Sequence, residues 1–136
     1  MIWETQVAYT IIDKKGNDRQ VKEKYLVEHG DTFTVVEDKL FGEFGARTCF
    51  EVQAIKQSKA KEILSYKKDV EEKIWLGELQ YVFHTDEGEE KYIKYKVFLC
   101  AKTFDEAKAS LGEYIKQGYD MDIVNIKLTN FEDILR

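Results

Sequence analysis

The chain has 136 residues and a formal net charge of −5. This length suits about one domain, and the acidic total excludes a duplex-DNA binder, which needs a basic face. The sequence contains no apolar run of about 18 residues and does not begin with the basic-then-apolar pattern of a secretory signal, so we expect a soluble, cytoplasmic protein outside the membrane.

Residues 3–12 alternate between apolar and polar side chains, which predicts a strand with one buried face. Residues 13–18 (DKKGND) contain the Asp, Gly and Asn typical of a hairpin turn. Alternation resumes over 19–28 and predicts the second strand of the hairpin.

A helix is predicted over 33–44, because apolar residues recur there at helical spacing after Asp31 and Thr32, either of which can cap the helix. A third strand is expected over 48–57. We interpret the following SKAKEIL segment as a short helical turn and residues 65–73, which are charged and without apolar period, as a solvated linker.

The second half follows the same plan. Strands are expected over 74–84 and 91–101, with TDEGEE as the turn between them. Thr103 and Glu106 form the spacing of a capping box for the next helix, and Gly118 is its expected C-cap. A strand over 120–128 and a helical turn at NFEDIL complete the pattern.

The two halves are related by a constant offset, which indicates an internal duplication. Trp3 corresponds to Trp75 at an offset of 72 residues, and beyond one deletion Leu40 corresponds to Leu111 at an offset of 71. We therefore predict an α+β fold in which residues 1–64 and 74–136 are two ββαβ halves, packed with pseudo-twofold symmetry in one compact domain. The predicted buried helix positions, packed against Val7 and Leu79, are Val36, Leu40, Ala107 and Leu111.

The sequence predicts no catalytic residues, metal site or cofactor. His29 and His84 have no Cys, Asp or Glu at zinc-ligand spacing, and no glycine-rich phosphate loop is present. Cys49 and Cys100 lie in apolar strand patterns, so we expect buried free thiols. We therefore expect a protein that is not an enzyme.

Matching cations and hydroxyls in the two halves are the candidate ligand-binding residues. Lys56 with Ser58, and Lys127 with Thr129, would supply charge-assisted hydrogen bonds to an anionic ligand at a seam between the halves. The simpler interpretation places these lysines on exposed strand ends. Lys24 and Lys96 on the second strands are the next candidates.

The aromatic residues and the hairpin charges each allow a further interpretation. Aromatics interleaved with lysines favour a stacking surface for single-stranded nucleic acid, but alternation places them on opposite faces, so core packing is the better explanation. The first hairpin turn is basic and the second acidic, which would let the two hairpins, or two copies of the chain, attract each other. The residues concerned are Lys14, Lys15, Arg19, Asp86, Glu87, Glu89 and Glu90.

The segments IWETQVAY, KEKYLV, FEVQAIKQSKAKEIL, TFDEA and IVNIKL resemble an uncharacterised family, domain of unknown function forty-four ninety-four. The resemblance covers nearly the whole chain and implies a small protein of Bacteroidetes-type bacteria or their phages. It implies no site residues.

These observations favour a non-enzymatic phage or mobile-element binding protein. Our first hypothesis is a counter-defence protein that captures a small anionic nucleotide or blocks a host protein. The alternative is a single-stranded nucleic-acid-binding accessory of phage replication. A homo-oligomer is compatible with either function.

Overall fold

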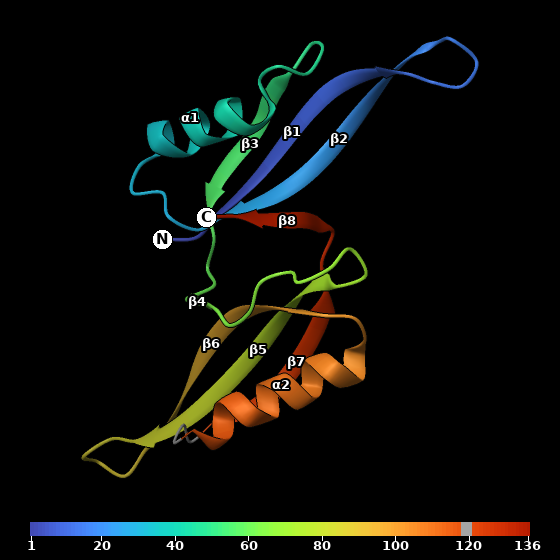
Figure 1. The fold of residues 1–136 in the computed structure, drawn as a ribbon. Coiled ribbons are helices and arrows are strands. Elements are labelled where there is room, and N and C mark those ends of the chain that lie inside the picture. The colour runs from blue at the N-terminus through green and yellow to red at the C-terminus, as the bar shows by residue number, and fades with distance from the viewer. Residues whose placement is uncertain (118–120) are drawn as a thin grey trace. The chain divides into compact units, whose positions relative to one another are not determined.

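The computed structural model describes residues 1–117 and 121–136, which form an α+β fold (Figure 1). Within this described part of the chain there are two four-stranded sheets and two helices. In chain order the elements are β1 (Trp3–Ile12), β2 (Asp18–Val27), α1 (Phe33–Phe44), β3 (Glu51–Gln57), β4 (Glu62–Ile63), β5 (Lys73–His84), β6 (Glu90–Ala101), α2 (Phe104–Lys116), β7 (Met121–Leu128) and β8 (Phe131–Leu135).

The chain divides into two compact units. Unit 1 contains Met1–Ser58 and Phe131–Arg136, and its strand order is β3-β1-β2-β8. Unit 2 contains Lys59–Asn130, and its order is β7-β5-β6-β4. The two sheets therefore have the same topology, in which an antiparallel hairpin is flanked by an antiparallel strand on one side and a parallel strand on the other.

The fourth strand of each sheet comes from the other predicted half of the sequence. β4 ends the first predicted half but pairs in parallel with β6, whereas β8 ends the second predicted half and pairs in parallel with β2. The prediction that residues 58–64 (SKAKEIL) and 130–135 (NFEDIL) form helical turns was wrong. Both segments are extended because an open strand edge supplies the hydrogen-bond partners that a short isolated turn would lack. The predicted boundary at residue 64 consequently differs from the unit boundary after Ser58.

The two hairpin turns have the same backbone geometry. Gly16 and Gly88 both adopt a φ of 81°, which is the left-handed region that glycine enters without steric cost. In the first turn the Asp13 N–H donates to the Asn17 carbonyl, and in the second the Thr85 N–H donates to the Glu89 carbonyl. The predicted hairpins are thus confirmed at both positions.

Both helices begin at the predicted caps. The Thr32 hydroxyl accepts from the Val35 N–H at 3.3 Å, and the Thr103 hydroxyl accepts from the Glu106 N–H at 3.2 Å. The Glu106 carboxylate accepts from the backbone N–H of Lys102, one residue before the cap, so the capping box is closed in a shifted form. The predicted C-cap Gly118 lies outside the described residues.

Each unit has its own hydrophobic core between the helix and one face of the sheet. The four predicted helix positions are fully buried, and so are Val7 and Leu79 on the strands opposite them. In unit 2, a Cβ at Gly77 would lie 2.9 Å from both Leu111 methyl carbons, so this glycine lets the helix approach the sheet closely. The core members are Val7, Tyr25, Val27, Val36, Leu40 and Phe44 in unit 1, and Trp75, Leu79, Val97, Leu99, Ala101, Ala107 and Leu111 in unit 2.

The two tryptophans have equivalent roles in the two units. The Trp3 indole N–H donates to the Gly30 carbonyl at 2.6 Å, and the Trp75 indole N–H donates to the Ala101 carbonyl at 2.9 Å. The first bond ties β1 to the loop before α1, and the second ties β5 to the last residue of β6, just before α2. Core packing is confirmed for four of the aromatic positions on the strands: Tyr25 and Trp75 belong to the two cores, and Trp3 and Tyr95 pack against them. Tyr9 instead lies under the Arg47 guanidinium, 4.4 Å from the ring centroid.

The prediction for the cysteines was correct for one of the two. Both are free thiols, and Cys100 is buried in β6, but Cys49 is exposed. Cys49 has a φ of 53° and lies in the turn before β3, which begins at Glu51 rather than at residue 48. Its side chain therefore does not share the strand alternation that predicted burial.

Among the described residues, no helix combines the length and the apolar character needed to cross a membrane.

Candidate functional site

A groove lies in unit 2 along α2, and we call it the α2 groove. It consists of two adjoining hollows of about 470 and 380 Å³ that share Ser65 and Ser110. One wall is α2 and the other is the segment from β4 to the start of β5. The lining residues are Glu62, Ile63, Leu64, Ser65, Lys68, Glu72, Cys100, Ala101, Glu106, Ala109, Ser110, Glu113, Tyr114 and Gln117.

The segment that forms the second wall is held to the edge of β6. The N–H groups of Lys61 and Leu64 donate to the carbonyls of Lys96 and Phe98, each at 2.8 Å. The Ser65 hydroxyl accepts from the Cys100 N–H at 2.9 Å. These contacts hold the second wall of the groove in place independently of any ligand.

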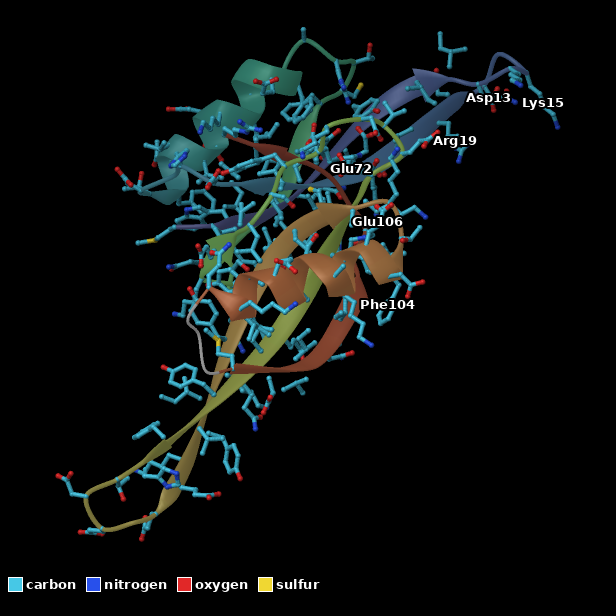
Figure 2. All side chains as sticks on the ribbon, turned by 60° about the horizontal axis from the view of Figure 1, so that its bottom comes forward. Asp13, Lys15, Arg19, Glu72, Phe104 and Glu106 are labelled. Atoms are coloured by element: carbon cyan, nitrogen blue, oxygen red, sulfur yellow. The ribbon has the colours of Figure 1, made fainter. Side chains whose placement is uncertain are left out.

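The rest of this wall is the stretch that the sequence predicts to be a solvated linker. Lys102, just before α2, forms ion pairs with Asp69 at 3.3 Å and with Glu71 at 3.6 Å. The hydrogen bond and the charge of Asp69 raise the pKa of Lys102. The Glu72 carboxylate accepts from the Lys68 N–H. The stretch is thereby folded against the helix start, and Figure 2 labels Glu72 and Glu106, which belong to the two walls.

The groove is lined by four carboxylates and one lysine. Glu62 and Glu113 border the larger hollow, whereas Glu72, Glu106 and Lys68 border the smaller one. This balance favours a cationic group over a phosphate, because like charges repel and opposite charges attract most strongly near low-dielectric walls. Serine and glutamine side chains add neutral donors and acceptors.

Glu62 is the centre of a small hydrogen-bond network in the larger hollow. Its carboxylate accepts from the Tyr114 hydroxyl at 2.8 Å and from the Tyr95 hydroxyl at 3.1 Å. Burial, followed by the hydrogen bond to Glu62, raises the pKa of Tyr114. Glu62 reaches these tyrosines because β4 pairs with β6, although β4 lies in the first predicted half of the sequence and α2 in the second.

Unit 1 has a different cluster, of one carboxylate, one arginine and aromatic rings, on the helix side of its sheet. Arg47 forms an ion pair with Glu23 at 2.9 Å, and its guanidinium lies over the rings of Tyr9 and Phe44 at 4.4 and 4.7 Å. Burial, with the charge and hydrogen bond of Glu23, raises the pKa of Tyr25. Arg47 covers this cluster, and sequence patterns gave no signal for it because Arg47 lies in a loop.

These raised tyrosine pKa values predict an alkaline loss of stability. The folded state holds the phenolic proton more tightly than the unfolded chain, so this contribution is complete below the unfolded tyrosine pKa of about 10 and is lost as pH rises above it. We expect the urea midpoint to fall as pH rises above about 10 and to fall less in Tyr25→Phe and Tyr114→Phe. Exposed Tyr92→Phe is the control, and equal slopes in all four proteins would contradict the assignment.

The six residues predicted to bind an anion are distributed over both units. Lys56 and Ser58 belong to unit 1, and Lys127 and Thr129 to unit 2. Lys56 lies 3.9 Å from the Glu4 carboxylate, and the Thr129 hydroxyl donates to the Ile74 carbonyl at 2.7 Å. The Ser58 N–H donates to the Ile2 carbonyl at 2.8 Å. Their joint role at one ligand stays a prediction.

The second-strand lysines differ in their surroundings. Glu78 lies 4.0 Å from Lys96 and 3.3 Å from Lys127, so one carboxylate offsets two of the predicted cations. Lys24 lies on β2 opposite Gln6. Lys56 and Lys127 remain largely exposed, so the anion hypothesis stays a prediction.

The two histidines belong to different units. His29 lies on the surface beside Glu28 at 3.8 Å, and His84 ends β5 in an exposed position. Within residues 1–117 and 121–136, no three His, Cys, Asp or Glu side chains gather in a way that would hold a metal ion.

The fold and the groove define an α+β protein with two equivalent sheets and a carboxylate-lined groove beside the second helix. The chain belongs to the family described as "Domain of unknown function (DUF4494)", which matches residues 1–136. No curated protein matches it.

Proposed function

We propose that this chain is a non-enzymatic binding protein whose α2 groove takes a lysine- or arginine-bearing segment of a protein partner. The observation that supports this proposal is the negative charge of the groove lining, which contains four carboxylates and one lysine. A cationic side chain entering the groove would meet carboxylates on both walls and serine hydroxyls between them. The proposed partner is therefore a host protein rather than a nucleotide.

Capture of a nucleotide is less well supported. A phosphate in the α2 groove would face like charges, and Lys56, Lys96 and Lys127 each lie within 4.0 Å of a glutamate carboxylate. Single-stranded nucleic acid is the weaker alternative. Tyr92 shares one face of β6 with Lys94 and Lys96 by strand alternation, but this end of the hairpin is rich in carboxylates.

The proposed origin of the chain is a tandem duplication of a ββαβ unit. The shared sheet order, the identical hairpin turns and the equivalent tryptophan hydrogen bonds support it. A phage or mobile-element context and a counter-defence role are narrower proposals, and they rest on the family resemblance.

Binding to the α2 groove is testable with defined probes. The chain is titrated, with backbone amide NMR as the readout, against a lysine- and arginine-rich peptide, an acidic peptide of equal length and a mixture of nucleotides. We expect shifts in residues 62–72 and in α2 with the basic peptide alone. The double variant Glu72→Gln/Glu113→Gln should weaken binding about tenfold or more, since two charge-assisted contacts are weakened.

The control is Glu43→Gln, an exposed carboxylate on α1 outside the groove, which should leave the affinity unchanged. Equal weakening by both variants would show that binding follows net charge rather than the groove. Shifts with nucleotides and none with the basic peptide would overturn the proposal in favour of nucleotide capture.

A further inference from the structure

The outer part of each hairpin is a two-stranded arm that extends beyond the other strands of its sheet (Figure 1). We define the basic arm as residues 11–22 and the acidic arm as residues 82–93. Ladder pairing of β3 with β1 ends at Ala8, and pairing of β7 with β5 ends at Tyr81. Among the described residues, the ladders that continue beyond Ala8 and Tyr81 toward the turns are those between the two strands of each hairpin.

Both arms expose apolar side chains. In the basic arm Ile11 and Ile12 are 39% and 73% exposed, and in the acidic arm Tyr92 is 58% exposed. Val82, Phe83 and Ile93 also reach the surface of the acidic arm. Strand alternation places Ile11 and Ile12 on opposite faces of the basic arm, while Val82 lies opposite Tyr92 on one face of the acidic arm. Exposed apolar side chains rimmed by charges are typical of a surface that binds a protein.

The two arms have the same turn geometry and opposite charge. The basic arm carries four cations and two carboxylates, whereas the acidic arm carries four carboxylates and one lysine. At equivalent turn positions Lys14 and Lys15 correspond to Asp86 and Glu87. Figure 2 shows Asp13, Lys15 and Arg19 at the end of the basic arm. The Asp13 carboxylate accepts from the Lys15 and Asn17 N–H groups, so one of the two basic-arm carboxylates is used within its own turn.

Each arm also has an open backbone edge. On its outer side β6 pairs with β4 at Val97 and Phe98, and β2 pairs with β8 from Lys24 onward. The strand segments nearer the turns have no ladder partner on that side among the described residues. Unpaired edges of this kind are templates for a strand from another chain.

We propose that the basic arm of one copy docks on the acidic arm of a second copy. Complementary charge selects this partner, and the exposed apolar residues supply the area that becomes buried. The contact is heterologous, because each copy contributes a different arm, so association can continue beyond a dimer. It is independent of the α2 groove.

Sedimentation velocity of the full chain tests the proposal. We expect a mass that grows with concentration in about 0.05 M salt and association that weakens in about 0.5 M salt, where charges are screened over a few ångströms. Lys14→Glu/Lys15→Glu makes both arms acidic, and Asp86→Lys/Glu87→Lys makes both basic. Each variant alone should associate at least about tenfold more weakly than the wild type.

Mixing the two variants separates arm pairing from other causes. An equimolar mixture should regain association, because each acidic arm then meets a basic arm of the other variant, while circular dichroism shows both variants folded. The groove variant Glu113→Gln is the control and should associate like the wild type. A wild type that stays monomeric, variants that associate unchanged, or a mixture that does not recover would each overturn the proposal.

Discussion

Removal of residues 131–136, which contain β8, is expected to loosen its pairing partner β2 and to leave β6 intact. In the native sheet β8 pairs with β2 from Lys24 to Val27, and the Glu28 N–H donates to the Leu135 carbonyl at 2.8 Å. The deletion also removes buried Ile134. The free energy of unfolding should fall by at least about 2–5 kcal/mol, the cost of truncating one buried isoleucine, with the lost ladder adding to it.

Hydrogen exchange locates the effect. Amides of β2 from Lys24 to Val27 should exchange faster in the shortened chain, whereas amides of β6 at Val97 and Phe98 should keep their protection. The single variant Glu132→Ala, at an exposed β8 position, is the control and should behave like the wild type. Faster exchange in β6 with β2 unchanged would mean that each repeat pairs with its own terminal strand.

Leu111→Ala should destabilise unit 2 by about 2–5 kcal/mol, because the truncation leaves a cavity in a fully buried site. The site has little room to collapse. Both Leu111 methyl carbons lie 2.9 Å from where a Cβ at Gly77 would be, so the helix already contacts the sheet backbone closely. Leu40→Ala at the equivalent position of unit 1 should have a cost in the same range.

Chemical denaturation measures both losses. Leu128→Ala is the matched control, since this leucine is 53% exposed and its truncation should change the unfolding free energy by less than about 0.5 kcal/mol. A loss below about 0.5 kcal/mol for Leu111→Ala would show that this helix face is not the packed one.

The sequence by itself determined the local elements. Alternation predicted the hairpin strands, glycine with Asp and Asn predicted the turns, and apolar spacing predicted both helices with their buried positions. These features depend on residues close together in the chain. The repeat offset also indicated that the two halves would share one plan, and the two sheets have the same strand order.

Only the tertiary structure decided which sheet edge β4 and β8 would each join. Three or four residues carry too little periodicity to choose between a turn and a strand, and the two available edges have the same topology. That choice created the candidate site. Glu62 meets Tyr95 and Tyr114, and the stretch after it becomes a wall of the α2 groove, because β4 pairs with β6. Pairing between residues distant in sequence is settled by the hydrogen bonds and apolar surface of the whole sheet, which no local pattern records.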